Sequence, residues 1–76
     1  GDVYKRQEVL IVDRSIKPSH NRIVVATIDG EFVCKRLKLK PRMCLMPENP
    51  DYPPIFVNHG QELEIVGTVT AAINKF

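Results

Sequence analysis

A lysine on a predicted strand is the residue most able to do chemistry. Side chains of a strand alternate between two faces, and the run 31–40 is typical of a strand. One face is basic and solvated: Arg36, Lys38 and Lys40. The other face is apolar apart from a single lysine: Val33, Lys35, Leu37 and Leu39. A lysine that faces hydrocarbon loses its proton more easily than one in water, and a neutral amine is a general base.

Periodicity leaves a second interpretation of Lys35 open. From a strand edge, its long side chain can extend the ammonium to water while the stem covers apolar surface. On the residues alone, this structural role is favoured over catalysis.

Four residues could serve metal or redox chemistry, but their spacing does not favour it. His20 and His59 lie in loop-like segments with no second ligand at metal spacing, so turn or surface roles are expected. Cys34 and Cys44 form no CxxC or Cys/His pattern, so we expect reduced core thiols. No metal and no cofactor is therefore expected.

Two charged groups are also candidates. Glu62 and Glu64 share one face of a predicted strand, where a pair of solvated carboxylates is favoured over acid/base catalysis. The basic series Lys38, Lys40 and Arg42 could meet DNA or an acidic partner, although a solvated face is the simpler interpretation.

The elements that must position these residues are short strands joined by turns. Asp29-Gly30 lies between two extended runs and predicts a tight hairpin. Four prolines within residues 47–54 exclude regular structure there, and Gly67 predicts a bulge or kink. The sequence predicts an all-β fold of six or seven strands, over residues 9–12, 22–28, 31–39, 43–46, 55–57, 62–66 and 68–73.

Length and charge narrow the class of protein. Seventy-six residues form one domain at most, and no apolar run is long enough to span a membrane. The start of the chain does not resemble a secretory signal, so we expect a cytoplasmic protein. The formal net charge is only +2, so no direct nucleic-acid binding is expected.

The first residues raise a separate question. Residues 2–7 read DVYKRQ, which resembles the translated end of a transposase sequencing adaptor. We therefore expect residues 1–7 to be a non-native tail and the natural chain to begin at Glu8, within a longer protein. The alternative is a polar tail that matches by chance.

Six segments, in this order along the chain, carry a family resemblance: IVDR at 11–14, SH at 19–20, IVVATIDGEF at 23–32, KRL at 35–37, PENPDYPPI at 47–55 and LEIVGTVTAAI at 63–73. Together they resemble the C-terminal peptidase domain of the LexA and UmuD proteins, and most closely the UmuD-like subunits of error-prone translesion polymerases. Residues 8–76 would then be the C-terminal part of such a domain, a compact twisted sheet or partial barrel truncated at its N-terminal side.

The resemblance also implies an activity. Proteins of this family cut their own N-terminal segment with a Ser nucleophile and a Lys general base, without metal or cofactor, when a recombinase filament forms on damaged DNA in the SOS response. The lysine of the family's V-x-K-[RK]-L strand is Lys35 here, which turns the balance toward a catalytic role. The resemblance further implies a homodimer that partners a translesion polymerase.

Three departures from the family pattern are visible. The nucleophilic Ser lies upstream in the family and has no counterpart in this chain, since Ser15 and Ser19 match no catalytic position. We therefore expect this piece alone to be inactive. The family's His-Gly-Asp turn reads His-Asn-Arg at residues 20–22, and Cys34 stands where near relatives have Thr.

Two other functions remain open. The chain could be the cleavage and dimerisation domain of a LexA-like or phage repressor, or a non-catalytic dimerisation module that keeps only the sheet. The upstream sequence separates the three.

Overall fold

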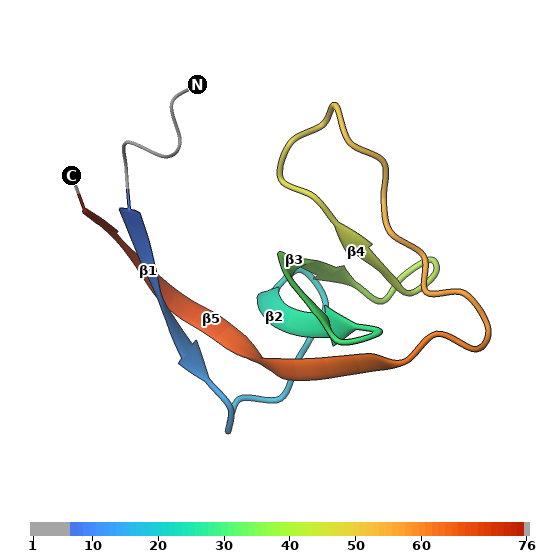
Figure 1. Cartoon of the computed structure of the whole chain (residues 1–76), viewed down its shortest axis with the longest axis horizontal. Coiled ribbons are helices and arrows are strands. Elements are labelled where there is room, and N and C mark those ends of the chain that lie inside the picture. The colour runs from blue at the N-terminus through green and yellow to red at the C-terminus, as the bar shows by residue number, and fades with distance from the viewer. Residues whose placement is uncertain (1–6, 76) are drawn as a thin grey trace.

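Five antiparallel strands form one open sheet in the computed structural model, which describes residues 7–75 (Figure 1). The strands are β1 (Gln7–Asp13), β2 (Ile23–Ile28), β3 (Glu31–Lys38), β4 (Cys44–Met46) and β5 (Leu63–Lys75), in the spatial order β1-β5-β2-β3-β4. The all-β prediction is confirmed. Residues 7–75 contain no helix of the length and apolarity that crossing a membrane requires. The predicted non-native tail lies outside the described residues except for Gln7, which begins β1.

The β2–β3 hairpin forms where Asp29-Gly30 predicts it. Ile28 pairs with Glu31, so the loop has two residues, with φ of 49° at Asp29 and 85° at Gly30. Positive φ at both positions matches the twist of the flanking strands, which is why Asp-Gly is favoured there. Asp29 also exchanges hydrogen bonds with the Glu62 backbone, since its amide donates to the Glu62 carbonyl and its Oδ1 accepts from the Glu62 amide, each at 2.9 Å. The hairpin is thereby tied to the start of β5.

The sequence predicted two strands at the C-terminal end, and the structure has one. β5 pairs with β2 along its first part and with β1 along its second part. The β2 register passes from Ile65 to Gly67, which leaves Val66 as the extra residue of a bulge. The predicted bulge or kink at Gly67 is therefore confirmed. The prediction of two separate strands is wrong, because a bulge bends a strand without ending its pairing.

The predicted strand at residues 55–57 is reduced to one isolated bridge. Leu45 and Ile55 exchange backbone hydrogen bonds of 2.9 and 2.8 Å, and no longer ladder follows within the described residues. The prolines of residues 47–54 lack the amide donors that a longer ladder needs.

The core lies at one end of the sheet. Val24, Ala26, Leu37 and Leu45 are fully buried, and partly buried apolar side chains pack around them: Ile28, Val33, Ile55, Leu63 and Ile65. None of these residues belongs to β1 or to β5 beyond Gly67. We call β1 together with residues 68–75 the arm, which extends away from the remaining strands in Figure 1.

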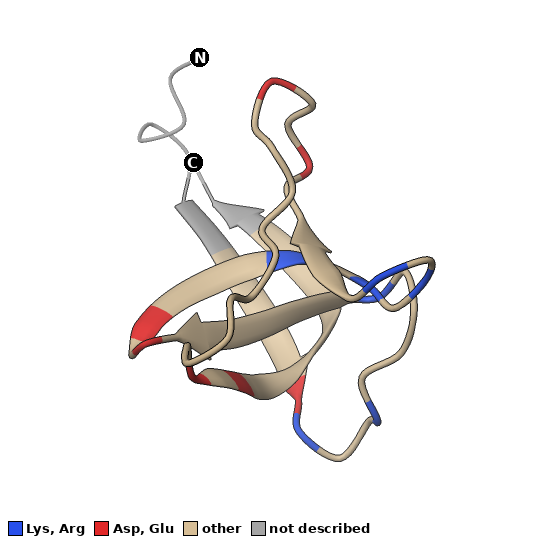
Figure 2. Cartoon of the chain, turned by 90° about the vertical axis from the view of Figure 1, so that its right-hand side faces the viewer, with Lys and Arg blue, Asp and Glu red and all other residues tan. Residues whose placement is uncertain are grey.

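Two groups of like charge lie at different ends of the sheet. Figure 2 shows Asp and Glu at the β2–β3 hairpin and along the start of β5, and also on the loop after β4, whereas Lys and Arg gather on the second half of β3 and the turn after it. The acidic group comprises Asp29, Glu31, Glu62 and Glu64. The basic group comprises Lys35, Arg36, Lys38, Lys40 and Arg42.

Candidate active site

Lys35 lies on the core side of β3, as the alternation of its strand predicts. It pairs with Val24 of β2, and Val24 in turn pairs with Thr68 of β5. Residues directly opposite one another project from the same side of a sheet, so the three side chains form a row. Val24 and Thr68 are both 0% exposed. Lys35 therefore emerges next to fully buried neighbours.

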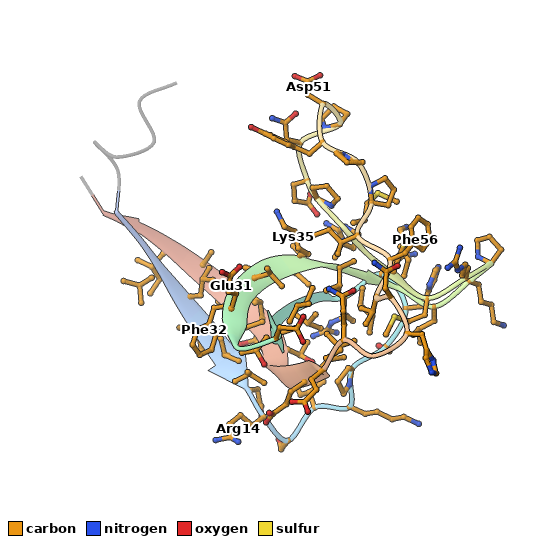
Figure 3. The ribbon with its side chains drawn as sticks, turned by 45° about the vertical axis from the view of Figure 1, so that its right-hand side comes forward. Arg14, Glu31, Phe32, Lys35, Asp51 and Phe56 are labelled. Carbon is orange, nitrogen blue, oxygen red and sulfur yellow. The ribbon has the colours of Figure 1, made fainter. Side chains whose placement is uncertain are left out.

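The lysine itself is half-buried rather than enclosed. β4 ends at Met46 opposite Arg36, so no residue of β4 pairs with Lys35. The next residue of the chain, Pro47, is buried and has no amide donor with which to extend the ladder. Figure 3 shows the Lys35 side chain on the side of β3 that faces the loop tipped by Asp51. Lys35 thus lies at the edge of the core rather than inside it.

The three cationic residues of this strand are used differently. The Arg36 Nε donates to Glu48 Oε1 at 2.9 Å in an ion pair, and the Lys38 Nζ donates to the Asn21 side-chain oxygen. The Lys35 amine has no hydrogen bond or ion pair with any described side chain. Of the three cationic side chains, Lys35 is therefore the one that no described side chain holds.

The turn at residues 19–22 fixes the strand that carries Lys35. The Asn21 amide donates to the Leu37 carbonyl and the Leu37 amide donates to the Arg22 carbonyl, both at 2.8 Å. Arg36 Nη1 also donates to the Asn21 carbonyl at 2.7 Å. Asn21 has φ of 70°, a left-handed conformation that Asn adopts more readily than other residues with a side chain. Asn can therefore occupy the place of the family's Gly without losing the turn.

The histidines take structural positions. His20 Nδ1 accepts a hydrogen bond of 2.9 Å from the Leu39 amide, which joins the turn to the end of β3. His59 is exposed in a loop. Within residues 7–75 no group of three or more His, Cys, Asp or Glu side chains is arranged to hold a metal ion.

Ser15 lies just after β1 and is already hydrogen-bonded there. Its hydroxyl and its amide donate to Asp13 Oδ1 at 2.6 and 2.8 Å, and these bonds lower the pKa of the Asp13 carboxyl. Asp13 pairs with Thr68, three strand spacings from Lys35, or roughly 14 Å at about 4.8 Å per strand. Ser19 is exposed, and its carbonyl accepts from the Arg22 amide within the turn. The structure brings neither serine to Lys35.

The remaining candidates are surface residues, with one correction. Glu62 and Glu64 are both exposed. Cys44 is buried, as expected of a core thiol, but Cys34 is exposed and that prediction is wrong. Cys34 shares the uncovered face of β3 with Phe32, which is 73% exposed, because the core covers only the opposite face of that strand.

A family model described as Peptidase S24-like matches residues 2–70. The chain belongs to this family. The resemblance read from the six segments is thus confirmed, together with the all-β peptidase fold that it implied.

Individual relatives agree with this assignment. The chain is 48% identical to the protein SamA of Salmonella typhimurium over 68 residues, which cover 90% of the chain and 46% of SamA. It is 51% identical to the protein MucA of Escherichia coli over 67 residues, 87% of the chain and 46% of MucA. A LexA repressor of Citrifermentans bemidjiense is 49% identical over 53 residues, 67% of the chain and 26% of the repressor. The chain spans just under half the length of SamA and MucA.

Proposed function

We propose that the intact protein is a UmuD-type peptidase of the SOS response that cuts its own N-terminal segment, with Lys35 as general base. The observation that carries the proposal is the Lys35 amine, which stands beside buried Val24 and has no partner among the described side chains. The family assignment supports peptidase chemistry for such an amine. The nucleophilic hydroxyl would come from sequence upstream of residues 8–76, so this piece by itself would be inactive.

The chemistry follows from a hydroxyl and a neutral amine alone. Lys35 takes the proton of the Ser hydroxyl, and the oxygen attacks a carbonyl carbon of the protein's own chain. The ammonium of Lys35 then protonates the departing amine, which breaks the peptide bond and leaves an ester on the Ser. Lys35, neutral again, deprotonates the water that hydrolyses the ester. One amine thus serves first as base and then as acid.

The test uses the full-length parent, recovered from the flanking gene sequence. We expect Lys35→Ala to abolish self-cleavage at every pH, and Lys35→Arg to do the same because a guanidinium keeps its proton. Lys38→Ala is the matched control, since Lys38 lies on the same strand and points to the opposite face. Cleavage is followed by gel as a function of pH. A Lys35→Ala protein that still cleaves in alkaline buffer would refute the assignment.

We propose further that the protein acts in the cytoplasm as a homodimer. A recombinase filament would prompt cleavage and a translesion polymerase would be the partner, while neither cofactor nor direct nucleic-acid contact is required. The arm supports the dimer, because its apolar side chains Val9, Ile11 and Ile73 are 40–49% exposed. Light scattering of the full-length protein tests the dimer, and a monomer at all concentrations would contradict it.

A repressor domain is the second candidate, favoured by the similarity to the LexA repressor. That similarity covers 67% of the chain, against 90% for SamA, which is why the UmuD type is preferred. A helix-turn-helix domain upstream would select the repressor, and a short arm with a Ser-Met site would select the UmuD type. Absence of that Ser would leave a non-catalytic dimerisation module.

A further inference from the structure

A pocket of about 390 Å³ lies at the turn between β3 and β4. Three cationic side chains and three apolar ones line most of it, together with Pro41 and Pro54: Lys38, Lys40, Arg42, Cys44, Met46 and Phe56. Its size is at the lower end of the range for sites that take small ligands, and it suits one large side chain with its flanking backbone. Figure 3 shows Phe56 on the segment that returns past this turn.

This pocket is on the opposite face of the sheet from Lys35. Cys44 pairs with Lys38 and Met46 pairs with Arg36, so these side chains share one face. Leu37 and Leu45 pair between them and point to the core side, where Lys35 also points. The pocket is therefore separate from the candidate active site, and its occupant need not be the segment that is cut.

The pocket combines an apolar floor with a purely cationic rim. Cys44 is only 5% exposed at its base, and Met46 is half-buried. The rim carries Lys38, Lys40 and Arg42, and no carboxylate lines the pocket. The acidic side chains of the β2–β3 hairpin lie at the other end of the sheet (Figure 2), and Glu48 on the loop after β4 is paired with Arg36, which does not line the pocket. The cationic rim complements acidic groups on a ligand, and the apolar floor fits an apolar side chain of the same ligand.

We propose that this pocket docks an acidic peptide segment of a partner protein, which inserts one bulky apolar side chain between flanking carboxylates. A nucleic acid fits less well. The Arg42 guanidinium lies over the Phe56 ring, 4.5 Å from its centre, and so occupies a ring face on which a base would stack. Apolar insertion supplies the contact area, and the three cations supply orientation and faster association.

The test measures binding of a fluorescein-labelled hexapeptide to the 76-residue chain by fluorescence anisotropy. The probe has Leu and Phe at its centre and two acidic residues on each side. We expect saturable binding that weakens with salt. A probe with Ser in place of the two apolar residues should bind about tenfold more weakly, which corresponds to about 1.4 kcal/mol. Equal binding of the two probes would overturn the proposal, because charge alone would then explain it.

Two charge-reversal variants locate the site. Lys40→Glu with Arg42→Glu should weaken binding at least tenfold, whereas Arg14→Glu with Lys17→Glu, the same charge change at exposed residues outside the pocket, should leave it within about twofold. Circular dichroism checks that both variants keep their strands. Equal loss in the two variants would overturn the proposal. A labelled single-stranded oligonucleotide serves as the alternative ligand. The proposal would also be overturned if the parent bound this oligonucleotide and not the peptide, and if only the pocket variant lost that binding.

Discussion

The two parts of β5 show how similar apolar side chains reach different environments. Near its start, Leu63 and Ile65 pack against a core that is fully buried at Val24 and Ala26. Past Gly67, in the arm, Ile73 is 49% exposed, and Ile11 on the paired strand is 47% exposed. Both parts are continuous, hydrogen-bonded sheet. Strand pairing therefore does not decide burial.

The difference lies in what covers the sheet. The segment that follows β4 returns beside it, and the bridge to Leu45 places Ile55 against the core. Within the described residues, no side chain of the arm belongs to this core or packs against it. Burying a large aliphatic side chain stabilises a fold by about 1.5–3 kcal/mol. The arm therefore offers surface whose burial the proposed homodimer would use.

The largest effect that tests this comparison is a truncation in the core. Leu37→Ala should lower the free energy of unfolding by about 2–5 kcal/mol, because Leu37 is fully buried and its loss leaves a cavity. Ile11→Ala in the arm should cost less than about 1 kcal/mol, because the side chain is already half in water. Urea denaturation followed by circular dichroism measures both. Similar losses would mean that the arm is covered in solution.

The junction between the two parts of β5, at Gly67, provides the second test of this comparison. A Cβ at Gly67 would lie 2.4 Å from Val12 Cγ1, closer than atoms can approach, so Gly67→Ala should destabilise by about 1–3 kcal/mol. The second substitution Val12→Ala removes that methyl group and should recover part of the loss, giving a non-additive pair. Val9→Ala in place of Val12→Ala is the control and should recover nothing. Additive losses in the Val12 pair would show that the clash is not with this side chain.

A third test concerns the turn that holds β3. Asn21→Ala and Asn21→Gly both remove the side-chain oxygen that accepts from Lys38, so they differ mainly in backbone freedom. At φ of 70°, Ala should be less stable than Gly by about 1 kcal/mol. In the full-length parent, the Ala variant should also self-cleave more slowly because β3 carries Lys35. Ala and Gly variants of equal stability would contradict the left-handed turn.

The sequence was most informative where a local rule operates. Asp29-Gly30 predicted a two-residue hairpin because the turn is decided by its own two residues, and the alternation around Lys35 placed that side chain on the core side because pairing preserves the period of two. The continuity of β5 was missed because it depends on a change of partner from β2 to β1. The exposure of Cys34 was missed although the pattern shows it, because Cys34 shares the face of Arg36 and Lys38 that the alternation already assigns to solvent. The pocket at the β3–β4 turn was missed because Phe56 arrives from a distant segment.

The smallest effect is electrostatic and lies where the arm meets the following loop. Hydrogen bonds from the Ser15 hydroxyl and amide lower the pKa of Asp13 below its ordinary value of 3.8. A carboxyl whose pKa is lowered on folding stabilises the fold above 3.8, and this contribution is lost as the pH falls through the lowered value. Ser15→Ala removes the hydroxyl bond, so it should raise the Asp13 pKa in an NMR titration and slightly lower the unfolding midpoint at about pH 6.

That small deficit should shrink toward zero once the pH is low enough to protonate Asp13 in both proteins. Ser19→Ala, whose hydroxyl makes no bond to Asp13, should match the parent at both pH values. A Ser15→Ala deficit of equal size at both pH values would show that the hydroxyl acts through packing rather than charge.

Because Asp13 pairs with Thr68, next to Gly67, the same titration also reports whether the junction keeps its geometry when the arm is altered. An Asp13 pKa that stays low in Ile11→Ala but rises in Gly67→Ala would place the weak point at the junction rather than along the arm.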